Sequence, residues 1–353
     1  MSETLAVKVV QGIAFGVITC VSVFGNSLVI IAVYKNSNFR NAYNFYIVSL
    51  AISDLLVSVL VLPPNAIFTL QEKWILGPFL CQLWMMLDVM FCTASILNLC
   101  AISIDRLRAV VTPISYTTHK WSVGVIISLS IVWITSLIIG LLPIIIWTDT
   151  VVSRLNETEI CELPVDPIFA TVSSTFSFFV PCILIIICYI VILSALKKRL
   201  TEKMSKIGPT GITEDATTNV VDVDKEGVTT VSGKVATNVS LDDSSTQEQN
   251  AGGTTKNMKT KDAPKTNNSQ IQAVYKREMK TMKTLGIVLA VFIICWMPFF
   301  VCNVINSVSG PVNMNLFIVV IWMGYINSMI NPIIYSLKNK EYRKAFKSIL
   351  RCG

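Results

Sequence analysis

Seven apolar segments, each long enough to cross a lipid bilayer, constrain this chain more than any other feature of its sequence. A helix needs ~20 apolar residues to span the hydrocarbon core, and it satisfies all of its backbone hydrogen-bonding groups internally. Only 14% of the residues are charged, whereas soluble domains carry roughly 25%. The sequence therefore predicts an all-α membrane protein, a bundle of seven transmembrane helices. The segments occupy residues 9–34, 43–70, 78–104, 121–147, 168–196, 284–307 and 313–337.

The positions of lysine and arginine predict how the bundle is oriented. Nearly all of them follow the first, third and fifth segments or lie in the C-terminal tail, while the opposite side carries only Lys8, Lys73 and Arg154. Because basic loops stay on the cytoplasmic side, we expect a multi-pass protein of the plasma membrane with an extracellular N-terminus. The net charge of +7 favours membrane lipids as partners. Its spread over separate loops argues against nucleic acid.

The chain divides into five regions. Residues 201–274 contain no aromatic side chain and are rich in Thr, Ser, Asn and Lys, which is typical of disorder. In the tail, basic residues alternate with apolar ones at helical spacing, which predicts a helix on the membrane surface. The expected regions are an extracellular N-terminus (1–8), helices one to five (9–200), a disordered third cytoplasmic loop (201–275), helices six and seven (276–337) and a cytoplasmic amphipathic helix with its tail (338–353).

Three kinds of covalent modification are expected. Cys81 and Cys161 both fall on the outer side, where oxidising conditions favour a disulfide between them. Asn156 begins a sequon in the same outer loop and is a candidate for glycosylation. Cys352 follows the amphipathic stretch and is a candidate for palmitoylation; an unmodified thiol is equally consistent with the sequence.

Asp88 is the only charged residue between Trp74 and Ile104, in the middle of the third segment. Ionisable groups inside a membrane helix are costly and usually mark a ligand, ion or proton site. Arg106 follows eighteen residues later, which places both residues on one helix face roughly 27 Å apart. One helix thus offers an anion near the outer surface and a cation near the inner surface. A buried aspartate paired to a neighbour is the alternative reading.

Polar and aromatic residues on three other segments match this anion. The fifth segment carries serines that either form a hydrogen-bonding wall or bond to the backbone of their own helix: Ser173, Ser174 and Ser177. The sixth and seventh segments carry residues one turn apart: Trp296, Phe299, Phe300, Asn303, Trp322 and Tyr325. Aromatic stripes usually pack in a core. Together with Asp88 and the serines, we interpret them as the lining of a ligand pocket.

At this point the chain resembles the rhodopsin-like (class A) G-protein-coupled receptors, and within them the biogenic amine receptors. The resemblance covers everything except the first few residues and the 201–274 loop. In chain order, the motifs that carry it are Gly25-Asn26, Leu50-Ala51-Ile52-Ser53-Asp54, Trp74, Cys81, Asp88, Asp105-Arg106, Trp133, Pro143, Pro181, Tyr189, Phe292, Cys295-Trp296-Met297-Pro298-Phe299-Phe300 and Asn331-Pro332-Ile333-Ile334-Tyr335.

The resemblance implies a pocket for a protonated aromatic amine. Asp88 would pair with the ammonium group, the serines would receive ring hydroxyls, and the aromatic residues would add cation–π attraction of ~0.5–2 kcal/mol. The implied ligand is dopamine, noradrenaline or octopamine, with serotonin or histamine as the alternative. The implied ligand-binding residues are Asp88, Val89, Cys92, Ser173, Ser174, Ser177, Trp296, Phe299, Phe300, Asn303, Trp322 and Tyr325.

The resemblance also implies an ion site and a coupling surface. An oxygen-rich cluster would hold a sodium ion as an allosteric ligand, or else a structural water network: Asp54, Ser95, Asn327, Ser328 and Asn331. The implied activation and coupling residues are Asp105, Arg106, Ile114, Tyr189, Glu278 and Tyr335. The implied partners are a heterotrimeric G protein, with the inhibitory class favoured, and arrestin and receptor kinases. Leu107 departs from the aromatic residue usual after Asp-Arg in this family.

Other classes of membrane protein fit the sequence less well. A retinal protein needs a lysine in its seventh helix, and none lies between Thr284 and Leu337. A transporter needs several ionisable groups along a path, whereas only Asp54 and Asp88 lie deep. A membrane enzyme needs a nucleophile–base pair or metal ligands, so we expect no catalytic residue. A class A receptor for a peptide or lipid is the remaining alternative, and it explains neither Asp88 nor the serines.

Overall fold

The protein is a bundle of membrane-length helices, seen in a computed structural model. Seven helical stretches among the described residues are long and apolar enough to cross a membrane: Leu5–Lys35, Ala42–Gln71, Gly77–Val111, Val123–Thr158, Pro167–Arg199, Met282–Val308 and Met314–Lys338. The predicted fold class is therefore confirmed, and the chain is a multi-pass membrane protein. The structure describes residues 2–39, 41–112, 116, 121–162, 166–205, 268–310 and 312–351.

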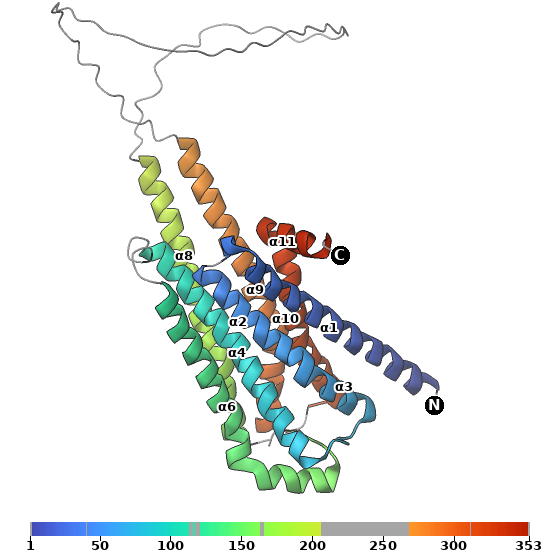
Figure 1. The fold of residues 1–353 in the computed structure, drawn as a ribbon. Coiled ribbons are helices and arrows are strands. Elements are labelled where there is room, and N and C mark those ends of the chain that lie inside the picture. Colours follow the sequence, from blue (N-terminus) through green and yellow to red (C-terminus); the bar gives the residue numbers. More distant parts are fainter. Residues whose placement is uncertain are drawn as a thin grey trace, which may run out of the picture.

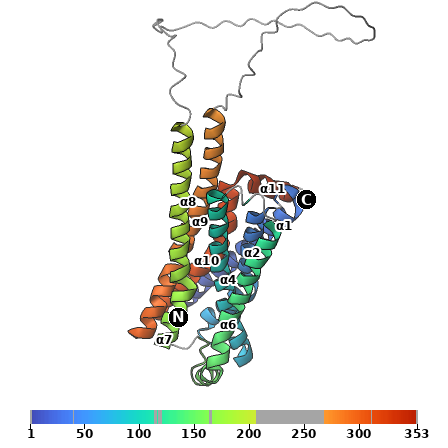
Figure 2. The same cartoon turned by 90° about the vertical axis from the view of Figure 1, so that its left-hand side faces the viewer.

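The third span lies at the centre of the bundle, because it contacts the second, fourth and fifth spans. Figures 1 and 2 show the spans side by side, with the last helix lying across the end from which α8 and α9 project. The N-terminus of α1 lies towards the other end. The α-helices are α1 (Ser2–Lys35), α2 (Ala42–Leu56), α3 (Leu62–Gln71), α4 (Gly77–Val111), α6 (Trp121–Thr158), α7 (Pro167–Ser174), α8 (Val180–Ser205), α9 (Asn268–Val308), α10 (Met314–Lys338) and α11 (Lys340–Arg351).

Two spans contain a π-helical turn in addition to α-helix. The second span is α2, the π turn Val57–Val61 and α3, and the fifth is α7, the π turn Thr175–Phe179 and α8. A π turn closes its hydrogen bonds over five residues instead of four. Side chains after such a turn therefore point in a different direction from the one that regular helical spacing gives. Both turns lie within the outer parts of their spans, near the polar residues considered below.

Four helix ends reach further than the sequence indicated. The first helix begins at Ser2, inside the expected N-terminal segment, and the Lys8 ammonium pairs with Glu72 at 2.8 Å. The fourth span continues as helix after a non-helical Trp147. The helices α8 and α9 enter the expected disordered loop by five and eight residues respectively. Charged, helix-compatible side chains allow these ends to continue into water. The rest of that loop lies outside the described residues.

The short helix α11 confirms the amphipathic helix expected after the seventh span. Its apolar face is buried, and the Tyr342 hydroxyl donates to Asn44 Oδ1 at 3.0 Å. The Tyr342 ring stacks on Phe39 with ring centroids 4.9 Å apart. Burial raises the pKa of the Tyr342 phenol well above its usual value, so this phenol remains a neutral donor. Cys352 lies outside the described residues, and its palmitoylation stays a prediction.

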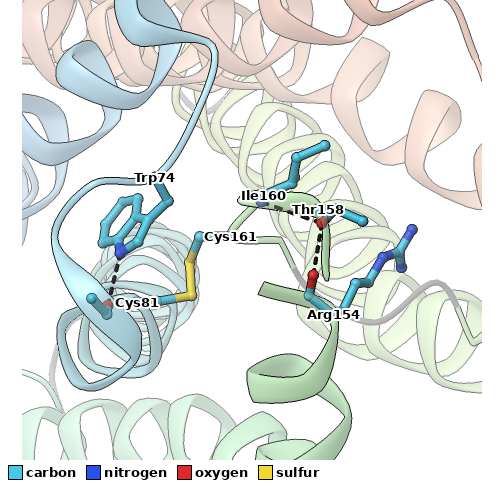
Figure 3. The surroundings of a disulfide bond; sticks show 7 residues. Trp74, Cys81, Arg154, Thr158, Ile160 and Cys161 are labelled. Atoms are coloured by element: carbon cyan, nitrogen blue, oxygen red, sulfur yellow. Dashed lines mark hydrogen bonds between the residues drawn. A yellow bond between two sulfur atoms is a disulfide. The ribbon is translucent and has the colours of Figure 1, made fainter. Parts of the chain in front are cut away.

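The expected disulfide links the start of the third span to the segment that follows the fourth span. Cys81 at the start of α4 is bonded to Cys161, with Cα atoms 5.8 Å apart (Figure 3). The Trp74 backbone N–H donates to the Glu159 carbonyl at 2.7 Å, which ties the two outer loops together a second time. Asn156 is exposed on the same outer segment. This exposure is compatible with glycosylation, which stays a prediction.

Candidate functional site

Asp88 projects from the middle of α4, and its carboxylate has only weak or neutral partners. The Cys92 thiol donates to Asp88 Oδ1 at 3.4 Å, and the Tyr325 hydroxyl lies beside the carboxylate and interacts with it. None of the ion pairs in the described part of the chain includes Asp88. Asp88 is partly buried, so its negative charge sits in a low-dielectric bundle without an internal cation. Such a carboxylate is suited to binding a cationic ligand.

Aromatic rings from α9 and α10 form a continuous wall beside this carboxylate. The Trp296 ring is edge-on to Tyr325, with centroids 6.2 Å apart, and edge-on to Phe299 at 5.8 Å. Trp322 is edge-on to Tyr325 at 5.8 Å. The structure thus brings the predicted aromatic residues of α9 and α10 into contact through Tyr325, which also lies beside Asp88.

The fifth span adds Phe178 to the site, a residue that was not among the predicted site residues. Phe178 is fully buried, lies in the π turn of the fifth span and stacks on Phe300 with centroids 4.4 Å apart. Its partner Phe300 belongs to the predicted stripe on α9. In the sequence, this position is marked only as an aromatic residue next to a serine cluster. The orientation of Phe178 could not be predicted because the residue lies in a π turn.

The three serines of the fifth span have different surroundings. Ser174 is 1% exposed and accepts a hydrogen bond from Asn303 Nδ2 at 3.3 Å. Ser173 donates to the Ala170 carbonyl at 3.3 Å, which is the backbone bonding considered as the alternative. Ser177 is partly buried within the π turn. The fifth span therefore contributes one hydrogen-bonded polar pair to the site, Ser174 with Asn303. Regular helical spacing would place Ser173 and Ser177, four residues apart, on one face of the helix. That spacing does not apply across the π turn.

A second carboxylate, Asp54, is fully buried deeper in the bundle, and three side chains donate to it. Ser328 Oγ and Asn331 Nδ2 lie 3.0 and 2.8 Å from its two oxygens, and Ser95 Oγ lies 3.3 Å away. The Oδ1 atoms of Asn327 and Asn331 are buried without a hydrogen-bond partner. Hard cations such as sodium prefer oxygen ligands, and unpartnered amide oxygens beside a carboxylate fit such an ion. They also fit a bound water.

The C-terminal end of α4 holds an ion pair between neighbours. Arg106 Nη2 lies 2.6 Å from Asp105 Oδ2, and the Tyr116 hydroxyl donates to Asp105 Oδ1 at 3.1 Å. The Arg106 guanidinium also lies 4.4 Å from the ring centroid of Tyr43. Burial and the negative charge of Asp105 raise the pKa of the Tyr116 phenol to about 12. Tyr43 and Tyr116 were not predicted as site residues, because aromatic residues near a helix end carry no specific signal.

Leu107, the departure from the usual aromatic residue, packs on an apolar cluster between three helices. This cluster includes Val110, Ile192 and Met282, so Leu107 contributes to packing at the inner end. Tyr335 is buried beside Tyr342, with ring centroids 5.6 Å apart. Ile114 and the side chain of Glu278 lie outside the described residues.

The sequence of this chain matches a known protein family. The family model described as "7 transmembrane receptor (rhodopsin family)" matches residues 25–335. The chain belongs to the rhodopsin family of seven-transmembrane receptors. Members of this family are receptors and not enzymes, which confirms the expectation of no enzymatic activity.

Relatives cover nearly the whole chain. A protein named "Probable G-protein coupled receptor No18" from Amphibalanus amphitrite is 34% identical over 95% of this chain and 88% of its own length. A 5-hydroxytryptamine receptor 1F from Cavia porcellus is 34% identical over 93% of this chain and 88% of its own. An octopamine receptor from Bombyx mori is 31% identical over 93% of this chain and 85% of its own.

Gly324 lets the Trp296 ring pack directly against the backbone of α10, which gives a test of the aromatic wall. A Cβ atom at this position would lie 2.9 Å from two carbons of that ring, whereas a Cβ at Gly16 would meet nothing within 4 Å. We expect Gly324→Ala to lower the thermal unfolding midpoint in detergent, because overpacking costs about 1–3 kcal/mol. Gly16→Ala, the matched control, should leave the midpoint unchanged or raise it. Equal midpoints for the two variants would show that Trp296 does not pack as described.

Proposed function

We propose that this chain is a plasma-membrane receptor for a small aromatic amine, with its N-terminus outside the cell. The observation that carries the proposal is the Asp88 carboxylate, which faces an aromatic wall and pairs with no described basic residue. A protonated amine supplies the missing positive charge, and its ring packs among Trp296, Phe299 and Tyr325. The printed names of relatives, a 5-hydroxytryptamine receptor and an octopamine receptor, support an amine over a peptide or lipid.

The polar pair of Ser174 and Asn303 favours an amine with a hydroxylated ring. The Ser174 hydroxyl accepts from Asn303 and keeps its own hydrogen available for a ligand oxygen. A catecholamine or phenolamine, such as dopamine, noradrenaline or octopamine, presents a ring hydroxyl to this pair. Serotonin is the second candidate, because its indole also carries a hydroxyl and relatives are named as receptors for it. Histamine, which has no ring hydroxyl, is the third.

We further propose that the inner end transmits agonist binding to a heterotrimeric G protein of the inhibitory class. An agonist that binds the open state better shifts the population towards it, which requires Arg106 to leave Asp105 and Tyr43. Sodium bound at Asp54 would stabilise the closed state, and arrestin and receptor kinases would act on the open one. The support for inhibitory coupling is the length of the segment between α8 and α9, by analogy with amine receptors.

Replacing Asp88 tests the ligand class. We expect Asp88→Asn to weaken binding of the active amine at least about 30-fold, because truncating one partner of a buried charge pair costs ~2–5 kcal/mol. The measurement is competition by octopamine, dopamine, noradrenaline and serotonin on membranes of transfected cells. Asp149→Asn, at an exposed position of the outer segment, is the matched control and should bind normally. Full affinity of Asp88→Asn for every active amine would refute the proposal.

The signalling proposal has its own readouts. The active amine should lower cyclic AMP in transfected cells, and pertussis toxin should abolish this response. A rise in cyclic AMP that the toxin leaves intact would contradict the inhibitory assignment. Added sodium should weaken agonist binding to the wild type and leave Asp54→Asn unaffected. An equal sodium effect in both proteins would place the ion elsewhere.

A further inference from the structure

Two hydrogen bonds lead from the second span to the Tyr325 hydroxyl, which lies beside the Asp88 carboxylate. Thr69 Oγ1 donates to Asn65 Oδ1 at 3.1 Å, and Asn65 Nδ2 donates to the Tyr325 hydroxyl at 3.2 Å. The Tyr325 hydroxyl in turn interacts with the Asp88 carboxylate. Asn65 is 5% exposed and Tyr325 is 2% exposed, so little water competes for these bonds. The chain therefore couples α3 to the proposed amine-binding carboxylate.

The orientation of the Asn65 amide sets the direction of each bond in this chain. A threonine hydroxyl with its hydrogen on the amide oxygen of Asn65 leaves the NH₂ group to point at Tyr325. The Tyr325 oxygen then accepts from Asn65 and has its own hydrogen free for Asp88. The opposite amide orientation would place Oδ1 towards Tyr325 and draw the phenol hydrogen away from the carboxylate. Thr69 partners the amide oxygen in the orientation that directs the Asn65 NH₂ group at Tyr325.

Backbone geometry explains how Asn65 comes to face the bundle. The π turn Val57–Val61 precedes Pro63 and Pro64 at the start of α3. Proline has no backbone N–H to donate and fixes φ, and the π turn changes the direction of the side chains that follow. Trp84 Nε1 donates to the Val61 carbonyl at 3.2 Å, which secures this turn against α4.

We propose that Asn65 is a positioning residue of the amine site, which holds the Tyr325 hydroxyl on the Asp88 carboxylate, with Thr69 bound to its amide oxygen. This inference rests on the proposed function. Asn65 does not touch the ligand in this account. It acts through Tyr325, which then forms both a wall of the pocket and a donor to its anion. Donors aligned towards a carboxylate favour its charged form, which is the form that binds an ammonium group.

A double-mutant cycle tests this role. We expect Asn65→Ala to weaken binding of the active amine about fivefold to tenfold, the usual range for one hydrogen bond near a charge. Tyr325→Phe, which removes only the hydroxyl, should cause a similar or larger loss. Adding Asn65→Ala to Tyr325→Phe should then have no further effect, because the two act through one hydroxyl. The probes are tritiated octopamine and tritiated serotonin, with surface expression measured in parallel.

Thr69→Val is a second test variant, which preserves side-chain shape and retains Asn65. It should weaken binding about twofold to fivefold in the wild-type background and have no effect with Tyr325→Phe. Additive losses in the two backgrounds would overturn the inference and assign Asn65 a structural role only. Normal amine binding by Asp88→Asn would instead refute the proposed function. The two failures are therefore distinguishable, and Thr69→Val answers the question even if Asn65→Ala does not reach the membrane.

Discussion

The Asp88 carboxylate lies inside a membrane bundle, where a charge without a partner has an unfavourable free energy. The surrounding side chains partly compensate for that free energy. Burying an ionised group in a low-dielectric interior costs several kcal/mol unless hydrogen bonds or an opposite charge compensate for it. The described residues supply Asp88 with a thiol and a phenol and with no basic group. These donors lower the cost without neutralising the charge. In the proposed function, a cation from outside completes the compensation, so the ligand chemistry follows from this one side chain.

The two deep aspartates differ in how fully the protein satisfies them. Asp54 receives three side-chain donors, from Ser95, Ser328 and Asn331. Asp88 has a weak thiol donor, Cys92, and lies beside the Tyr325 phenol, which accepts from Asn65. The same residue type therefore forms a packed internal site in one place and, in the proposed function, a partly buried charge for a ligand in the other. What separates the two roles is the number and strength of neighbouring donors.

Much of the fold could be predicted from the sequence, because membrane-length apolar runs leave a helix bundle as nearly the only solution. Asp88, the aromatic stripes and the Cys81–Cys161 pairing were also predictable, since charge, helical period and compartment decide them. The two π turns were not. They arise from local backbone packing near prolines, and they alter the direction of Ser177 and Phe178. Apolar and charged residues alike let helices continue past the membrane, so the helices extend beyond the expected bounds at both their starts and their ends.

The residues that the sequence missed act through pairs that meet only in three dimensions. Asn65 contacts Tyr325 across 260 positions of sequence. Tyr43 and Tyr116 reach Arg106 and Asp105 from other parts of the chain. None of the three belongs to a motif, and a buried asparagine or a tyrosine at a helix end is common in any bundle. Their partners became evident only once the helices were placed against one another.

The central claim is that the ligand is held by its positive charge at Asp88. Its most direct test changes the ligand and leaves the protein intact. Competition binding on wild-type membranes should compare the active amine with an analogue in which a methyl group replaces the ammonium group. The account predicts that the uncharged analogue binds at least about tenfold more weakly, the lower limit for a hydrogen bond to a charged group (~1.5–3 kcal/mol). Equal affinity of the two compounds would contradict it.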